Sequence, residues 1–385
     1  MTKKNAKALL LKYQAGTATE DEKAFIDSWM LTGADSDIDL NDVELLNDLM
    51  EIRHGLAIDQ PYGRTVRLWP RIAVAASIFI VLSFSTYFLL HKNRVEALNA
   101  QNRIHDIAAG GNKAVLTLSN GKKIVLTNAG NGLLVKQGNS TVSKTADGQL
   151  AYQAPSLTER AGTAAVYDTL TVPRGGQYQL KLADGSTVWL NAATCIRYPA
   201  NFTGSERKVE LIYGEADFQV KHNAAMPFKV LATGQTIEDI GTNFNINAYG
   251  DEPSVRTTLL EGAINVSLPK SFSSSVKNVM GLKPGQQLVL QPTTNTTSIK
   301  EVDADVVVDW KNGEFYFKNE PLPSIMRRVS RWYDVKIVYE GNKINPVTYS
   351  GSLPRFSSLS KILEKLQGSG DVLFKIDGKK VIILK

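Results

Sequence analysis

Cysteine and histidine, the residues that most often hold metals or form cross-links, are scarce in this chain of 385 residues. Its single cysteine, Cys195, provides no disulfide framework from which a compartment could be assigned. Its four histidines are scattered without the spacing of a metal site (His54, His91, His105, His222). The sequence also lacks a glycine-rich phosphate loop after a strand and a serine nucleophile elbow. We therefore expect neither an enzyme nor a bound cofactor.

One long stretch lacks charge, proline and glycine altogether. It runs from Ile72 to Leu90, between Arg71 and His91. As a helix it would be about 28 Å long, close to the ~30 Å apolar core of a bilayer. The run is apolar all round, whereas a buried helix usually keeps a polar stripe. The sequence thus predicts one transmembrane helix over residues 72–90, and the arginines around it weakly favour an N-terminus on the inner side.

Residues 1–62 are predicted to form a small all-α domain of acidic character. Six Lys and Arg stand against twelve Asp and Glu there, whereas the remainder of the chain carries a net charge of +12. Thr17-Ala18-Thr19-Glu20 has capping-box spacing and predicts the start of the second helix. An acidic module suits a basic protein partner better than nucleic acid. Four apolar residues are candidates for that contact, or else form the core of the bundle: Phe25, Trp29, Leu46 and Met50.

Residues 91–113 are predicted to be a polar stalk, and strand patterns follow over residues 114–310. Alternating runs around Asn120-Gly121 and Asp184-Gly185 predict β-hairpins, and more such runs lie between residues 208 and 268. We expect a β-sandwich, barrel or β-helix-like stack, with residues 131–170 as loop. The acid pair Glu215 and Asp217 is expected at the surface, as such pairs in β-rich chains usually are.

The pattern of apolar residues changes over residues 311–385, where helical and strand spacings alternate. It predicts a βαβ unit followed by βαββ, a compact α+β domain. In the helix predicted over residues 322–333, Leu322, Ile325, Val329 and Trp332 are expected to face inward. Arg327, Arg328 and Arg331 are expected to face outward, as a docking face or, more commonly, as a solvated helix surface.

Several motifs resemble those of a known family and follow one another in the same order. Val172–Ala192 resembles the opening of the FecR-type periplasmic domain, and Gly241–Tyr249 and Leu260-Glu261-Gly262 follow in the family's order. Residues 311–385 are similar to the module that closes Bacteroidetes-type members, itself similar to the short N-terminal domain of secretins and TonB-dependent receptors. The resemblance covers about residues 114–385, with its core at about 172–266. Asp217 departs from the family, which often has tyrosine there.

The resemblance implies a multi-domain membrane protein, a transmembrane anti-sigma factor of the inner membrane with its N-terminus in the cytoplasm and its C-terminus in the periplasm. Residues 1–62 would hold an extracytoplasmic-function sigma factor, with no direct contact to nucleic acid. The periplasmic part would receive a signal from the signalling domain of an outer-membrane TonB-dependent receptor. Arg327, Arg328 and Arg331 are the candidates for contact with that receptor.

Two alternatives stay open. Some family members cleave themselves at a Gly–Thr bond that corresponds to Gly241-Thr242, where the threonine hydroxyl attacks the preceding carbonyl. The favoured interpretation here is that Gly241 is a strand-entry turn and Thr242 an ordinary strand residue. For the whole chain, the alternative is an inner-membrane-anchored module that binds a periplasmic glycan or peptidoglycan and has no sigma-factor role. Three aromatic residues could then stack on sugars, although such residues in strands are more often core: Trp189, Tyr198 and Tyr213.

Overall fold

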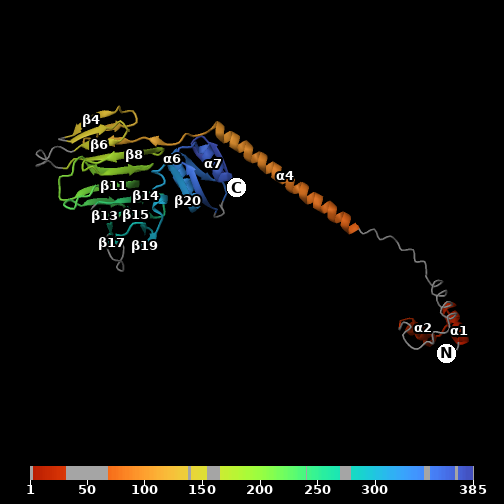
Figure 1. Ribbon diagram of the computed structural model, residues 1–385. Helices are drawn as coiled ribbons and strands as arrows, with labels where there is room; N and C mark the ends of the chain where they lie inside the picture. Colours follow the sequence, from red (N-terminus) through yellow and green to blue (C-terminus); the bar gives the residue numbers. More distant parts are fainter. Residues whose placement is uncertain are drawn as a thin grey trace. The chain divides into compact units, whose positions relative to one another are not determined.

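The computed structural model describes residues 3–31, 68–137, 140–153, 165–239, 241–268, 279–341, 347–368 and 372–384 (Figure 1). The chain divides into two compact units, Met1–Phe84 and Ser85–Lys385.

The first unit begins with two helices, α1 (Lys3–Gln14) and α2 (Glu20–Leu31), as predicted. The capping box lies two residues later than predicted: the Thr19 N–H donates to Glu22 Oε2 at 2.9 Å and the Glu22 N–H to Thr19 Oγ1 at 3.4 Å. Thr19, not Thr17, therefore caps α2. Tyr13 donates to Asp27 at 2.8 Å and so ties the two helices together. The sequence also predicts a third helix in this domain, with Leu46 and Met50, and it lies outside the described residues.

Helix α4 (Leu68–Ile104) contains the apolar run and is 37 residues long. No helix in the described part of the chain is both long enough and apolar enough to cross a bilayer. The predicted membrane span over residues 72–90 is therefore wrong by this criterion. Serine and threonine hydroxyls interrupt the apolar side chains at positions 77, 83, 85 and 86, and the helix continues without a break through Glu96 and Arg103. The assignment of the two ends of the chain to cytoplasm and periplasm stays a prediction.

The second unit begins with a β-rich part made of two sheets. Strands of the first sheet are β2 (Val115–Thr117), β3 (Lys123–Val125), β7 (Tyr167–Val172), β10 (Thr194–Pro199), β12 (Phe228–Ala232), β13 (Gln235–Asp239), β16 (Ile264–Ser267) and β17 (Val279–Leu282). Strands of the second sheet are β4 (Gly132–Gln137), β5 (Ser140–Lys144), β6 (Leu150–Gln153), β8 (Gly176–Lys181), β9 (Thr187–Leu190), β14 (Asn243–Ala248), β15 (Val255–Glu261), β18 (Gln286–Gln291) and β19 (Thr296–Glu301). The short strand β1 (Gly111–Asn112) pairs with β8.

The long strand β11 (Arg207–Gln219) belongs to both sheets. Residues 207–213 pair in the first sheet and residues 214–219 in the second. Gly214 stands at the change with φ of 104°, and a Cβ there would lie 2.5 Å from Thr194 Cα, so only glycine fits this corner. Apolar residues of both sheets, such as Leu170 and Phe218, share one buried core. The predicted sandwich-like β-rich part is thus confirmed.

The two predicted hairpins are confirmed, because β2 pairs with β3 and β8 with β9 in antiparallel fashion. The predicted loop over residues 131–170 is wrong, since β4, β5 and β6 form a continuous antiparallel run there. The frequent Ser, Thr, Ala and Gly of this stretch indicated a loop, yet Val142 and Leu150 are fully buried in the common core.

The C-terminal part has the predicted order of elements. They are β20 (Glu314–Pro321), α6 (Leu322–Tyr333), β21 (Lys336–Tyr339), β22 (Thr348–Pro354), α7 (Leu359–Gly368), β23 (Leu373–Asp377) and β24 (Lys380–Leu384), preceded by the short helix α5 (Ala304–Val307). Strands β20 and β22 form one antiparallel pair, and β21, β24 and β23 form a second sheet. The inward-facing residues predicted for α6 are confirmed, since Leu322, Ile325 and Val329 are fully buried. The predicted domain boundaries stay predictions.

The segment predicted as a stalk packs against this C-terminal part. Helix α4 extends to Ile104, and the Asn102 side chain is buried against β23. Arg103 pairs with Glu364 of α7 at 3.1 Å. Asp106 accepts hydrogen bonds from the Ser360 N–H at 2.8 Å and the Ser360 hydroxyl at 2.7 Å. The end of α4 is therefore fixed on the C-terminal part.

Candidate functional site

One face of the second sheet is polar although much of it is buried. In β11, Ala216 and Phe218 face the hydrophobic core, whereas Glu215 and Asp217 alternate with them and are also buried. Residues directly opposite on neighbouring strands point to the same face, and they are polar as well. We call this set the polar sheet face: Glu215, Asp217, Asn245, Asn247, Thr258 and Gln287.

Asp217 shows how a buried charge on the polar sheet face is neutralised by an ion pair. Its carboxylate is completely buried, and Lys311 Nζ contacts its Oδ1 at 2.7 Å. Burial raises the pKa of Asp217, and the charge of Lys311 offsets this only in part. The side chain that departs from the family pattern thus forms an ion pair with the segment that leads into the C-terminal part.

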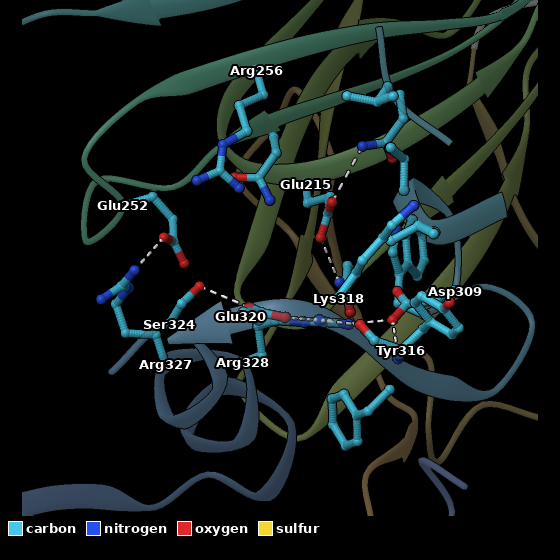
Figure 2. Close-up of a pocket in the computed structure, with 18 of the residues that line it drawn as sticks. Glu215, Glu252, Arg256, Asp309, Tyr316, Lys318, Glu320, Ser324, Arg327 and Arg328 are labelled. Atoms are coloured by element: carbon cyan, nitrogen blue, oxygen red, sulfur yellow. Dashed lines mark hydrogen bonds and ion pairs between the residues drawn. The ribbon is translucent and has the colours of Figure 1, made fainter. Parts of the chain in front are cut away.

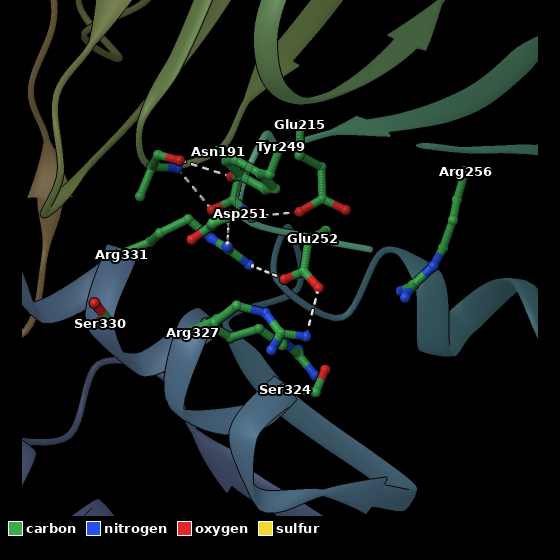
Figure 3. Close-up of polar contacts among 12 residues, drawn as sticks. Asn191, Glu215, Tyr249, Asp251, Glu252, Arg256, Ser324, Arg327, Ser330 and Arg331 are labelled. Carbon is green, nitrogen blue, oxygen red and sulfur yellow. Dashed lines mark hydrogen bonds and ion pairs between the residues drawn. The ribbon is translucent and has the colours of Figure 1, made fainter. Parts of the chain in front are cut away.

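Glu215 is the second buried carboxylate of this face. It accepts hydrogen bonds from Asn191 Nδ2 at 2.7 Å and from Asn245 Nδ2 at 3.2 Å (Figure 3). Burial raises the pKa of Glu215, and the two amide hydrogen bonds oppose this shift. Asn191 in turn accepts a short hydrogen bond from the buried guanidinium of Arg355, so the contact extends into the C-terminal part.

Two arginines of α6 share one carboxylate of the loop between β14 and β15. Arg327 Nη2 and Arg331 Nη2 each contact Glu252 at 2.8 Å, and Arg331 Nη1 contacts Asp251 at 2.7 Å (Figure 3). Burial disfavours the charged form of Glu252, but hydrogen bonds from both arginines outweigh it and lower its pKa. Such charge-assisted bonds are among the strongest polar contacts in proteins. They join α6 to the β-rich part.

The third arginine, Arg328, is held within the C-terminal part. It forms a short ion pair with Asp309 and a 2.9 Å ion pair with Glu320, and it donates to the Tyr316 carbonyl at 3.0 Å (Figure 2). Burial opposes the charge of Arg328, yet the two carboxylates raise its pKa overall. All three arginines of α6 therefore form ion pairs inside the chain.

A polar cavity of about 630 Å³ lies between the polar sheet face and the β20–α6 segment. Glu215, Asn245 and Asn247 line it on the sheet side, and Tyr316 and Lys318 line it on the β20 side (Figure 2). Its volume is in the range of pockets that take small molecules.

The receptor-contact candidates do not project freely into solvent as the helix pattern predicted. Arg331 is 5% exposed, and Arg327 and Arg328 are turned toward acidic partners. The sequence pattern missed this because the partners, Glu252 and Asp309, come from other elements. Their contact with a receptor stays a prediction.

The candidate cleavage site lies where the chain enters β14. The Gly241 N–H donates to Asp239 Oδ1 at 2.8 Å, and the Thr242 hydroxyl donates to the same oxygen at 2.5 Å. Gly241 has φ of 154°, and a Cβ there would lie 2.6 Å from His222 Cβ. The sequence did not single out Asp239 or His222 as neighbours of this bond. The interpretation of Gly241 as a strand-entry turn without cleavage stays a prediction.

Among the candidate sigma-factor contacts, Phe25 is 54% exposed on α2, whereas its neighbour Ile26 is buried. The Trp29 side chain, Leu46 and Met50 lie outside the described residues. Of the aromatic residues considered for sugar stacking, Tyr198 is core, Trp189 is half-buried and Tyr213 is 44% exposed.

Glu215 and Asp217 were predicted at the surface and are buried instead. Their signal in the sequence was present but ambiguous, because polar residues alternating with apolar ones normally indicate a solvated sheet face. This face is buried only because the C-terminal part, which comes about 100 residues later in the sequence, packs over it.

Comparisons with known proteins agree with this arrangement. The model of the FecR protein family matches residues 168–265, and the model of the FecR C-terminal domain matches residues 314–383. Two crystal structures of a candidate anti-sigma factor from Parabacteroides distasonis ATCC 8503 are similar to this chain, at 29% sequence identity and a TM-score of 0.51. They cover 56% and 57% of this chain and 98% and 99% of their own. A comparison with curated proteins gave no match. The chain thus carries a FecR domain followed by a FecR C-terminal domain.

Proposed function

We propose that this chain is an anti-sigma factor that holds an extracytoplasmic-function sigma factor through its N-terminal helices. The similarity to the Parabacteroides protein supports the general role. The observation that carries the proposal is the helical hairpin of α1 and α2, which leaves Phe25 and Leu11 more than half exposed. These two side chains offer apolar surface that a partner would cover.

The charge of α2 fits such a partner. Its first turn carries Glu20, Asp21 and Glu22; Glu20 pairs with Lys23 and Glu22 with Lys12. A sigma factor has basic DNA-binding surfaces, and an acidic helix attracts and orients a basic protein. Binding there would cover surface that the sigma factor needs for DNA or polymerase.

The signal would reach the chain through the FecR part, from the signalling domain of a TonB-dependent receptor. Asp251, which pairs with the buried Arg331 and is 50% exposed, is the accessible part of the contacts between α6 and the loop before β15. An acidic receptor surface could replace Asp251 as the partner of Arg331 and so loosen the contact between α6 and the β-rich part. We therefore expect Arg331→Ala to weaken binding of the purified receptor domain. Unchanged affinity would remove this contact from the proposal.

The sigma-factor role is tested by retention of purified host sigma factors on the immobilised full chain. We expect one sigma factor to be retained selectively and Phe25→Ala to reduce its retention at least tenfold. Phe356→Ala is the matched control, because Phe356 is 56% exposed in the C-terminal part. Retention of no sigma factor by the folded chain would reject the role and favour the module that binds a periplasmic glycan.

A further inference from the structure

The polar cavity has no role in the sigma-factor proposal and lies wholly within residues 191–355. Its sheet side includes Asn245, Gln287 and Lys300, and buried Thr258 lies between Asn245 and Gln287 in the same row across four neighbouring strands. Within this row Gln287 donates to Thr258 at 2.8 Å. Amides and hydroxyls at this spacing offer donors and acceptors alternately. Such a surface matches a ligand that also carries closely spaced hydroxyls.

Two amide oxygens of the cavity wall have no hydrogen-bond donor among the described residues. They are Oδ1 of Asn245, a residue that is 1% exposed, and Oδ1 of Asn247. Glu215 adds a buried carboxylate beside Asn245, which donates to it at 3.2 Å. Buried acceptors without donors are uncommon in folded proteins and call for a partner. The wall therefore favours a ligand that brings donors, as hydroxyl groups do.

The cations of the cavity fall into two groups. The arginines of α6 are paired with carboxylates, as described above. In contrast, Arg256, Lys300 and Lys318 line the cavity without an ion pair to any carboxylate of the described residues. Burial, and then the nearby charge of Arg256, lower the pKa of Lys300. Glu301 and Asp303 also line the cavity, but Arg256 and Lys300 form no ion pair with them, and two such neighbouring cations attract an anion.

We propose that the cavity binds a small anionic saccharide, a mono- or disaccharide that carries a carboxylate. Its hydroxyls donate to the amide oxygens of Asn245 and Asn247, and its carboxylate lies against Arg256 and Lys300. The ring of Tyr316, which is 38% exposed, lines the opposite side and provides an apolar surface (Figure 2). A volume of about 630 Å³ accommodates a ligand of this size.

An acidic peptide is the less favoured occupant. Its backbone amides are widely spaced, whereas the wall presents side-chain amides and hydroxyls on directly opposite positions of adjacent strands. A simple anion such as phosphate would use the cations but leave the amide oxygens of Asn245 and Asn247 without donors. A saccharide acid satisfies both ends of the cavity.

The ligand would touch both the β-rich part and β20. Since anything that binds only the folded state stabilises it, occupancy would strengthen the contact between the two parts. The proposal does not depend on sigma-factor binding, because the residues involved are separate from α1 and α2.

Calorimetric titration of the full chain tests the proposal with galacturonate and digalacturonate as probes. Glucose, inorganic phosphate and a tetraglutamate peptide serve as comparison ligands. Two variants change the cavity: Asn247→Ala, which removes a side chain without a hydrogen bond to the described residues, and Arg256→Gln. The control is Lys122→Gln, an exposed cation in the turn before β3. Thermal unfolding of each variant checks that it is folded.

We expect a uronate to bind and both cavity variants to weaken it about tenfold or more, with the control unchanged. Equal binding of glucose would overturn the anionic part of the proposal. Binding of phosphate or tetraglutamate as tight as that of the uronates would overturn the saccharide part. If no probe binds to the folded chain, or if the variants bind as the native chain does, the cavity holds only water and the proposal is wrong.

Discussion

Asn102 and Ile376, 274 positions apart in the sequence, are joined by a hydrogen bond of 2.7 Å from the Ile376 N–H to Asn102 Oδ1. The Asn102 amide also donates to the Phe374 carbonyl at 2.8 Å. One side chain thus occupies the free edge of β23, whose other edge pairs with β24. Unpaired strand edges need such cover. This contact fixes the end of α4, the helix that connects the N-terminal unit to the FecR part.

Replacing Asn102 by alanine is expected to destabilise the second unit. Two buried backbone groups lose their partners, which costs about 2–4 kcal/mol in total. Chemical unfolding followed by circular dichroism measures this change in the free energy of unfolding. Gln101→Ala is the control, since Gln101 is exposed on the same turn of α4. Equal stability of the two variants would show that the edge of β23 does not depend on Asn102.

The Glu252 carboxylate predicts a stability that falls in acid. Hydrogen bonds from Arg327 and Arg331 lower its pKa from the ordinary value of 4.5 despite burial. Its contribution is therefore complete above pH 4.5 and is lost as the pH falls through the lower, folded-state value. We expect Glu252→Gln to be less stable than the native chain at pH 7, with the difference vanishing in acid. Thermal unfolding at several pH values measures this, and a difference that does not depend on pH would contradict it.

Lys311 is expected to be essential for the buried charge of Asp217. Lys311→Met would leave a fully buried carboxylate without its cation, at a cost of about 3 kcal/mol at pH 7. The cost should shrink as the pH falls, because the raised pKa of Asp217 lets the carboxyl take up a proton. The double variant with Asp217→Asn should recover most of the stability. Chemical unfolding of the single and double variants checks this, and failure of the second change to help would refute the pairing.

The elements of the C-terminal part could be predicted because its periodicity is strong. Helix α6 has the predicted bounds, and Leu322, Ile325 and Val329 are buried as expected. Residues 131–153 were missed because Ser, Thr, Ala and Gly are frequent over residues 131–170 and were interpreted as loop. The short strands β4, β5 and β6 themselves carry Leu, Val and Tyr, and only packing shows that these belong to the core.

The site was harder to predict than the fold because it forms between distant segments. Glu252 lies 75 residues before Arg327, and Asp217 lies 94 residues before Lys311. No local pattern reports such pairs, so the arginines of α6 were interpreted as a solvated or docking face. The apolar run over residues 72–90 was interpreted as a membrane span for a related reason, because its length and composition were considered without the rest of α4.

Gly241 is expected to tolerate no larger residue. Its φ of 154° disfavours a side chain, and the alanine Cβ would lie 2.6 Å from His222 Cβ and 2.7 Å from His222 Cα. We expect Gly241→Ala to cost about 1–3 kcal/mol of stability. Gly130→Ala is the control, because a Cβ at Gly130 meets no atom within 4 Å. Thermal unfolding compares the two variants, and equal midpoints would argue against a constrained turn.

The turn at Gly241 and Thr242 can be either a simple entry into β14 or a site of self-cleavage, and an experiment distinguishes the two. Asp239 holds both the Gly241 N–H and the Thr242 hydroxyl, which fixes the entry into β14. If this contact is purely structural, denaturing mass spectrometry of the purified chain should give a single intact mass, which is the result we expect. A fragment beginning at Thr242 that disappears in Thr242→Ala would instead show that the hydroxyl attacks the Gly241 carbonyl. Thr242→Ser is the matched control, since serine keeps both the nucleophile and the hydrogen bond to Asp239 and should behave like the native chain.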